Sequence, residues 1–113
     1  MKENIDKILK KVCSVFDITI EDVRSKNREK HLVYARMICS KLIHSSCDCF
    51  TTEIAKHINR DSSTVRYYIS VFEQEYLYNK DFRAFADEVG VVSLEITNDF
   101  QRELEQELNE IIG

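Results

Sequence analysis

The chain has 113 residues, of which 43% are hydrophobic and 32% charged, as expected for one globular domain that buries a core without disulfides. It contains no proline and two glycines, which excludes long low-complexity linkers and favours helix throughout. No apolar run approaches the roughly 18 residues of a membrane span, and the charged N-terminus lacks a secretory hydrophobic segment. We therefore expect a cytoplasmic protein with no membrane partner.

The net charge of −4 is distributed unevenly along the chain. Residues 24–66 carry nine Lys or Arg against four Asp or Glu, whereas residues 67–113 carry three against eleven. A solvated face can hold such charges without a function. A basic stretch that coincides with a binding motif, however, is the distribution that phosphate binding requires.

Two helices are predicted before residue 25. Apolar residues recur at helical spacing over residues 3–16 and predict a core helix. They are Ile5, Ile8, Leu9, Val12 and Phe16. Thr19, followed by acidic residues at positions 21 and 22, has the pattern of a capped short helix that ends near Arg24.

Residues 25–30 form a polar basic loop without any apolar residue, so the loop cannot be buried. It contains Lys26, Arg28 and Lys30. Loops carry function more often than core segments do. An arginine here, beside a recognition helix, can enter a minor groove or clamp a phosphate. The alternative is a solvated connector.

Residues 31–45 have a broad apolar face, which predicts the central helix of a small bundle. Arg36 lies on this helix, just beyond the basic loop, and is expected either to brace the loop or to reach a DNA backbone. Residues 46–50 connect to the next helix, and Phe50 is expected to plug the core.

Two short helical patterns then meet at a tight connection in residues 51–72. Thr51 or Thr52 is expected to cap the first helix, because a hydroxyl accepts a backbone N–H that the helix start leaves unpaired. Asn59 is expected to end it in the left-handed conformation. Asp61 is expected to cap the second helix.

The second helix has a buried stripe of Val65, Ile69 and Phe72 and a polar opposite face. The polar face carries Ser62, Ser63, Arg66, Tyr67 and Ser70. Helix, short turn and donor-rich helix is the helix-turn-helix pattern, which places a recognition helix in the DNA major groove. The alternative is an ordinary helical hairpin whose outer face is only solvated.

The C-terminal third predicts an extension of the recognition helix to residue 78, a helix over 81–89 that closes at Gly90, and a last helix from Ser93. The last helix combines an apolar stripe with an acidic outer face. It can pack on its own domain, form a homodimer seam or mask the basic face, and amphipathicity alone does not choose between these. We divide the chain into a DNA-binding domain, 1–78, and an acidic helical extension, 79–113.

The four cysteines are expected to be free thiols, as is usual in the cytosol. Cys47 and Cys49, near His44, suggest a metal site, but the spacing lacks the two-residue gap of zinc knuckles and no second pair follows. We expect no metal and no cofactor. The histidines are scattered and no nucleophile–base pair is indicated, so neither an enzyme nor a small-molecule substrate is expected.

Four segments together resemble a known family. They are SKNR at 25–28, ARMI at 35–38, TTEIAKHI at 51–58 and RDSSTV at 60–65. Their order and spacing are similar to domain IV of the bacterial replication initiator DnaA, with the pattern SKxR…PRQxAMYL…SLxEIGxxFGGRDHTTVxHA. The resemblance runs from about residue 12 to residue 72. It implies an all-α fold, a small helical bundle with a Trp-repressor-like helix-turn-helix, here followed by a C-terminal helical extension.

The resemblance also implies roles for individual residues. The family's minor-groove arginine falls on Arg28, and its second arginine, on the following helix, falls on Arg36. The major-groove cluster falls on Arg60, Asp61, Ser62, Ser63 and Thr64. Asp61 can accept from a cytosine amino group, Ser63 can bind a base edge or a phosphate, and Thr64 can hold a phosphate. We expect phosphates to be anchored by Lys26, Lys30, Arg36 and Lys56. Arg66 is expected to contact the major groove with Asp61, Ser62 and Ser63, and Tyr67 lies on the same exposed face.

The chain also departs from the family pattern. The turn is one residue shorter, with only Asn59 in place of two glycines. Ser62 replaces a histidine, His44 replaces a lysine and Tyr67 stands where another histidine is usual. No GxxxxGK[ST] motif occurs, so we expect no ATPase activity. The predicted function is sequence-specific binding of double-stranded DNA, at a site related to the family's box TTATCCACA or at a regulatory site. The alternative is a protein-interaction module that has lost DNA binding.

Overall fold

The computed structural model describes residues 2–47 and 49–89, and within these ranges the fold is entirely helical. Six helices follow one another: α1 (Lys2–Phe16), α2 (Ile20–Arg24), α3 (Lys30–Cys47), α4 (Thr51–Ile58), α5 (Ser62–Tyr78) and α6 (Lys80–Val89). The expected all-α bundle is confirmed. The predicted last helix, with its homodimer seam, lies outside the described residues.

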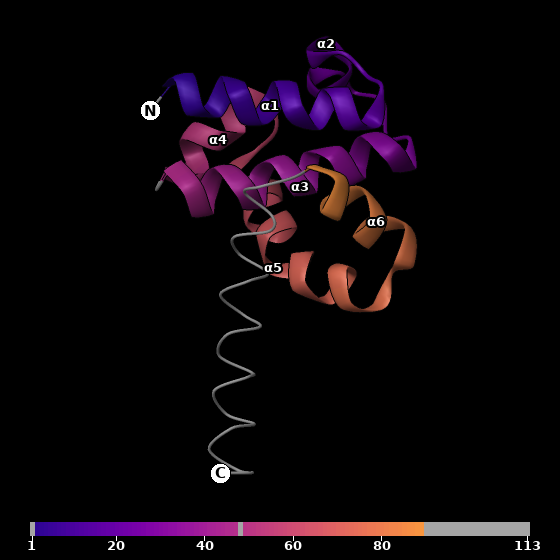
Figure 1. The fold of residues 1–113 in the computed structure, drawn as a ribbon. Coiled ribbons are helices and arrows are strands. Elements are labelled where there is room, and N and C mark those ends of the chain that lie inside the picture. The colour runs from indigo at the N-terminus through magenta and orange to yellow at the C-terminus, as the bar shows by residue number, and fades with distance from the viewer. Residues whose placement is uncertain (1, 48, 90–113) are drawn as a thin grey trace, which may run out of the picture.

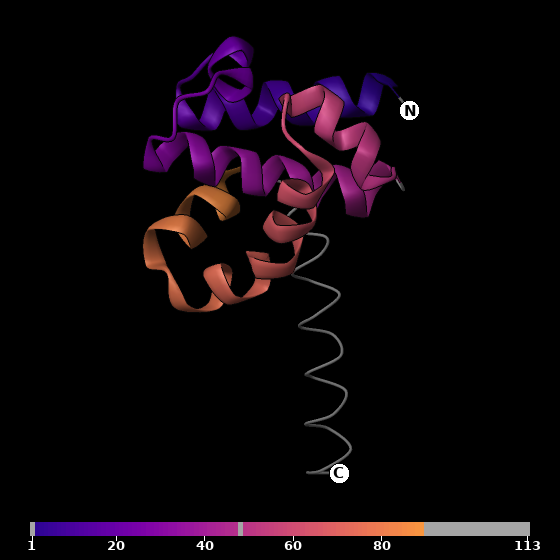
Figure 2. The same ribbon diagram turned by 180° about the vertical axis from the view of Figure 1, so that it is seen from behind.

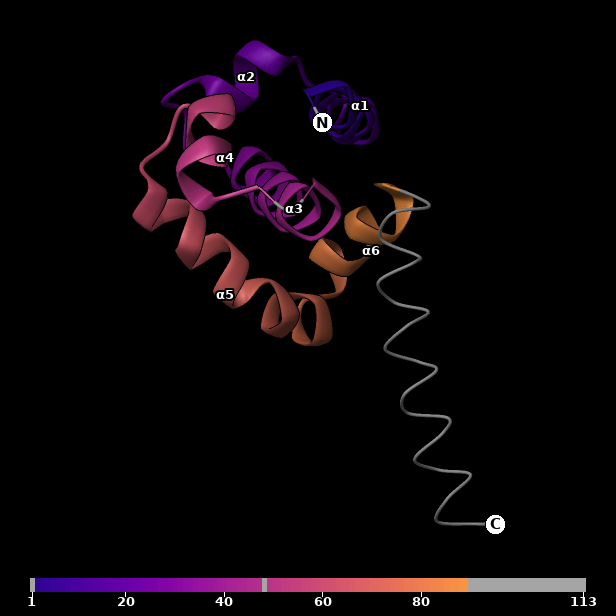
Figure 3. The ribbon, with the colours of Figure 1, turned by 90° about the vertical axis from the view of Figure 1, so that its left-hand side faces the viewer.

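Helix α3 is the centre of the bundle, and the other helices are arranged around it (Figures 1–3). It packs against α1, α2, α4 and α5, and α6 closes the far side by packing against α1 and α5. Consecutive positions 34–40 of α3 are all buried. A helix that is apolar nearly all round needs neighbours on every side, which explains why α3 lies at the centre of the bundle.

The helix ends agree with the local chemistry of the sequence. Thr19 and Asp22 form a reciprocal capping box: Asp22 N–H donates to Thr19 Oγ1 at 3.1 Å, and Thr19 N–H donates to Asp22 Oδ2 at 3.0 Å. Asn59 ends α4 in the left-handed region, with φ 56° and ψ 52°. Both predictions are confirmed.

Two predictions at the start of α4 are wrong. The helix begins at Thr51, so the N-cap position belongs to Phe50 and neither threonine caps. Phe50 is 82% exposed rather than a plug of the core. Its extended backbone turns the ring outward, whereas the flanking side chains of Cys47 and Cys49 are the buried ones.

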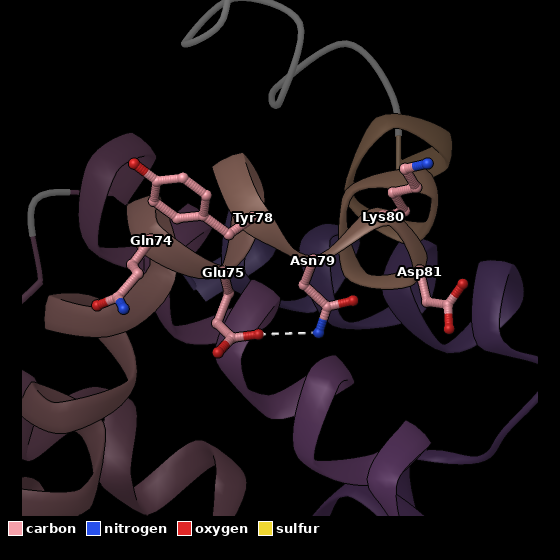
Figure 4. A pocket seen from close by; sticks show the side chains of 6 residues that line it. All are labelled: Gln74, Glu75, Tyr78, Asn79, Lys80 and Asp81. Atoms are coloured by element: carbon pink, nitrogen blue, oxygen red, sulfur yellow. Dashed lines mark hydrogen bonds between the residues drawn. The ribbon is translucent and has the colours of Figure 1, made fainter.

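Asn79 joins α5 to α6 and serves both helices. Its Nδ2 donates to Glu75 Oε2 at 2.9 Å and to the Tyr34 hydroxyl at 2.7 Å, while its Oδ1 accepts the Phe82 N–H at 3.1 Å. Figure 4 shows the Asn79 amide turned toward Glu75 at this corner, in the pocket between the two helices. The side chain caps the first turn of α6 and ties the corner to α3.

Aromatic rings fix α6 on the bundle. Phe82 is fully buried, with its ring edge-on to Tyr34 at 5.3 Å and to Phe72 at 5.4 Å between centroids. Phe85 stacks on Phe16 of α1 at 4.3 Å. The prediction of a helix over 81–89 with an inward aromatic face is confirmed.

Candidate nucleic-acid interface

Helices α4 and α5 meet in a three-residue turn, 59–61, and form the helix-turn-helix unit. The Arg60 N–H donates to the Ala55 carbonyl oxygen at 2.9 Å across the left-handed residue Asn59, which closes α4. Asp61 occupies the N-cap position of α5, as predicted, but its carboxylate makes no capping hydrogen bond. The carboxylate therefore stays exposed at the start of the helix.

Helix α5 is held by one face and exposes the other. Val65, Tyr68 and Phe72 are buried, and Ile69 packs on the core while half-buried. Tyr68 was missed by the predicted stripe, which named Ile69 in its place. Of the predicted outer face, Ser63, Arg66, Tyr67 and Ser70 are exposed, whereas Ser62 and the neighbouring Thr64 are half-buried. The exposed set lines the first two turns of the helix with hydroxyl and guanidinium donors.

The basic loop is exposed, as predicted, and has a defined conformation. Lys26, Arg28 and Lys30 are all exposed. Asn27 organises the loop: its N–H donates to Ser25 Oγ at 3.3 Å, and its Oδ1 accepts the Glu29 N–H at 3.0 Å. Such local side-chain bonds order a loop without burying it. Lys56, on α4, is exposed as well.

Arg36 corrects one of the predictions, because it does not face solvent and cannot anchor a phosphate from its position. It is 1% exposed. Its Nε donates to the Val23 carbonyl oxygen at 2.8 Å, and its Nη2 donates to those of Ser25 at 2.9 Å and Asp22 at 3.2 Å. Burial, and then the neighbouring charge of Arg60, lower the pKa of the guanidinium from its ordinary value. Of the two roles expected for Arg36, the structure shows the bracing role.

Arg60 is also engaged by the basic loop. Its Nη1 donates to the Asn59 carbonyl oxygen at 2.8 Å, and its Nη2 donates to that of Ser25. The side chain is half-buried. Two of the five N–H donors of Arg60 are engaged in these bonds, which leaves three for the predicted base contact.

Two further contacts, which join the end of α2 to the end of α4 and to the turn, had no signal in the sequence. Arg24 Nε donates to the His57 carbonyl oxygen at 2.8 Å, and Asn59 Nδ2 donates to the Arg24 carbonyl oxygen at 3.1 Å. The partners are 33 and 35 residues apart in the chain, so no periodicity or local motif could indicate them. They hold α2 beside α4, as Figure 3 shows.

The helix-turn-helix and the helices before it also match a known family. Residues 5–71 match the model of the bacterial DnaA protein helix-turn-helix. The chain belongs to this family. The match extends from α1 into α5 and includes all twelve residues that were predicted to bind DNA.

Curated relatives of the chain are proteins named chromosomal replication initiator protein DnaA. The chain is 39% identical over 72 residues to that of Oleidesulfovibrio alaskensis, covering 64% of this chain and 16% of the relative. It is 34% identical over 86 residues to that of Bacteroides thetaiotaomicron, covering 75% and 18%. It is 34% identical over 84 residues to that of Treponema pallidum, covering 74% and 18%. The chain thus spans less than a fifth of the length of these relatives.

Other features of this DnaA-type domain lie away from the interface. Cys13, Cys39 and Cys47 are buried free thiols, as expected, and burial raises the pKa of each. In residues 2–47 and 49–89, no three His, Cys, Asp or Glu side chains are grouped as metal ligands would be. The same residues contain no helix long and apolar enough to cross a membrane. The pocket of Figure 4 lies at the α5–α6 corner and is lined by Gln74, Glu75, Tyr78, Asn79, Lys80 and Asp81.

Proposed function

We propose that the protein reads double-stranded DNA in a sequence-specific manner, with α5 in the major groove and the basic loop over an adjacent minor groove. Membership of the DnaA helix-turn-helix family supports DNA binding. One structural observation carries the finer proposal. The exposed donors of α5 and the exposed cations of the loop belong to one rigid unit, because Arg60, from the turn before α5, donates to the Ser25 carbonyl oxygen at the base of the loop.

The start of α5 supplies the groups that read base edges. The Asp61 carboxylate, free of capping bonds, accepts from a cytosine amino group. Ser62 and Ser63 offer hydroxyls to base edges, and Arg66 donates to the acceptors of a guanine. Backbone N–H groups in the first turn of a helix have no partners within the helix, so they bind a phosphate beside these contacts, together with Thr64 and Tyr67.

Phosphate anchoring falls to the exposed lysines. Lys26 and Lys30 lie on or next to the loop, and Lys56 lies on α4. Arg28 enters the minor groove, where an arginine senses groove width. Because Arg36 is buried, the phosphate count is smaller than the sequence suggested. With about three phosphates neutralised by these lysines, affinity falls about 40-fold between about 50 and 200 mM salt.

The same comparison supports a proposal for the biological setting. We place the protein in the cytoplasm at the nucleoid, acting at a replication-origin box or at a regulatory site. The relatives are named as replication initiators, and the present 113 residues contain no GxxxxGK[ST] motif. We propose that DNA reading by these residues does not depend on ATP hydrolysis.

The test is a fluorescence-anisotropy titration with a duplex that carries TTATCCACA and a scrambled duplex, each at about 50 and 200 mM salt. Arg28→Ala and Ser63→Ala proteins are compared with the wild type. Lys10→Ala is the matched control, because Lys10 is an exposed lysine of α1, outside the loop and the helix-turn-helix.

Tighter binding of the box duplex, weakened by Arg28→Ala and Ser63→Ala but not by Lys10→Ala, supports a sequence-specific reader. Equal and salt-sensitive binding of both duplexes contradicts recognition of this box, and the preferred duplex is then selected from a randomised pool. No binding at either salt concentration overturns the proposal. That result would favour a protein-interaction module, for which the exposed Leu77 and Tyr78 at the end of α5 form a contact surface.

A further inference from the structure

Three side-chain hydrogen bonds join the end of α2 and the first residue of the basic loop to the end of α4 and the turn of the helix-turn-helix. Arg24 donates to the His57 carbonyl oxygen, Asn59 donates to that of Arg24, and Arg60 donates to that of Ser25. We propose that this latch of Arg24, Asn59 and Arg60 sets the spacing between Arg28 and α5, so that the two grooves are read together. These are positioning residues, and the inference rests on the proposed function.

The latch acts on the part of the chain that carries Arg28. From Ser25 to Glu29 the loop is otherwise held by short-range bonds of Ser25 and Asn27, by the Val33 N–H bond to the Glu29 carbonyl oxygen, and by the Arg36 bond to the Ser25 carbonyl oxygen. Those contacts shape the loop and fix its base to α3. Only the latch joins the loop to the segment that leads into α5, among the residues that the structure describes.

A fixed spacing matters because Arg28 and the exposed face of α5 must reach their two grooves at the same time. A loop that is already held in position loses less conformational freedom on binding, and the saving appears as affinity for the matching site. Contacts with phosphates alone tolerate a displaced loop, since phosphates repeat along the backbone. Loss of the latch is therefore expected to lower the preference for one sequence more than the affinity for DNA in general.

Asn59 allows the latch to be opened with little other change. Its backbone has φ 56°, a conformation that glycine adopts without a steric cost. Asn59→Gly therefore removes the amide that donates to Arg24 and keeps the turn and the net charge. Asp17→Gly is the matched control, because Asp17 is the other described non-glycine residue with positive φ, at 54°, and lies in the α1–α2 connection.

The experiment is a double-mutant cycle between position 59 and position 28, in the full chain, measured by anisotropy. The probes are the preferred duplex, TTATCCACA or the selected sequence, and its scrambled counterpart. Arg24→Lys, which keeps the charge but lacks the Nε–H, is a second variant that opens the latch from the other side. Circular dichroism verifies that each variant is folded at the temperature of the titration.

We expect Asn59→Gly to weaken the preferred duplex about tenfold and to leave the scrambled duplex and the salt slope unchanged. Arg28→Ala is expected to cost about 10- to 100-fold in the wild type, the range for an arginine that reads DNA bases, and less than about threefold once the latch is open. A role in stability alone would lower the melting temperature without this non-additivity.

The inference is overturned if Asn59→Gly and Arg24→Lys keep the full preference and the full cost of Arg28→Ala. DNA reading itself then stands. Failure of the proposed function is recognised separately. In that case the wild-type protein prefers no duplex in the selection, and both the proposed function and the latch are overturned. Asp17→Gly should match the wild type in the ratio between the two duplexes.

Discussion

The guanidinium groups of Arg36 and Arg60 donate to the same acceptor, the carbonyl oxygen of Ser25. Arg36 approaches from the buried side, on α3, and Arg60 from the turn before α5. Among the described residues, no carboxylate is recorded in an ion pair with either group, and backbone carbonyl oxygens accept the hydrogen bonds of both side chains. Two positive charges are thus held close together at the base of the basic loop by the backbone of Ser25.

Removal of Arg36 is expected to destabilise the fold. Arg36→Ala removes the donor to the Val23 carbonyl oxygen, leaves Arg60 as the side-chain donor to that of Ser25, and removes a buried side chain. Since a hydrogen bond to a charged group contributes about 1.5–3 kcal/mol and the bonds are not additive, the loss in unfolding free energy should be on the order of 3 kcal/mol. Urea denaturation followed by circular dichroism measures it.

Arg66→Ala is the matched control for that experiment, because Arg66 is an exposed arginine in the second turn of α5. Its unfolding free energy should stay within about 0.5 kcal/mol of the wild type. Its DNA affinity should fall, whereas Arg36→Ala should bind normally once its unfolded fraction is taken into account. A stable Arg36→Ala protein with weak DNA affinity would restore the phosphate-anchoring role.

Lys26 and Arg28 should differ in the way they contribute to DNA binding, although both lie exposed on one loop. Lys26→Ala should weaken all duplexes alike and reduce the slope of log K against log salt by about one, since one phosphate contact is lost. Arg28→Ala should cost about 1–3 kcal/mol on the preferred duplex and relax its sequence preference. Titrations at four salt concentrations separate the two. Identical behaviour of the two variants would mean that Arg28 binds only a phosphate.

Phe50 and Phe82 should respond in opposite ways to truncation. Phe50 is 82% exposed, so Phe50→Ala should change the unfolding free energy by no more than about 0.5 kcal/mol. Phe82 is fully buried between Tyr34 and Phe72, so Phe82→Ala should cost about 3–5 kcal/mol. Thermal and urea unfolding of the two proteins tests the pair. A large loss for Phe50→Ala would restore its predicted role in the core.

The buried thiols should make the fold sensitive to alkaline pH. Burial raises the pKa of Cys39 far above that of an exposed thiol, about 8.5 in the unfolded chain. The contribution of Cys39 to stability is complete below that value. It is lost as the pH rises above it, because the unfolded state then releases a proton that the folded state retains.

Urea unfolding at pH about 8 and about 10 measures this loss, with Cys39→Ala as the comparison. Tyrosines and lysines titrate in the same range, so the informative quantity is the difference in slope between the two proteins. Cys39→Ala should lose less stability across the interval than the wild type. Equal losses would show that ionisation of this thiol is not linked to unfolding.

Helix positions and the family could be predicted because they depend on local features. Periodic apolar residues, the capping box at Thr19 and the left-handed Asn59 each act over a few residues, and all appear in the structure. The prediction that Phe50 is buried was wrong because it had no such local feature to rest on. An isolated aromatic residue in a connection has no periodicity, so whether its ring faces the core or the solvent depends on the backbone of the whole connection.

The candidate site was predictable as a set of exposed groups but not as a set of contacts. The loop lysines and the outer face of α5 are exposed, as their polar pattern indicated. The partners of Arg24, Arg36 and Arg60 are backbone carbonyl groups, which every residue possesses. No side-chain type marks such an acceptor, so whether an arginine braces the fold or faces solvent depends on tertiary structure.

Helix α5 divides its residues between two tasks that hardly overlap. Val65, Tyr68 and Phe72 hold it in the bundle, while Ser63, Arg66 and Ser70 contribute nothing to the core. Residues on the outer face can thus be exchanged at little cost in folding. Under the proposed function, a few substitutions on this face would change the preferred DNA site while the scaffold stays constant, which makes α5 a suitable helix for randomised libraries.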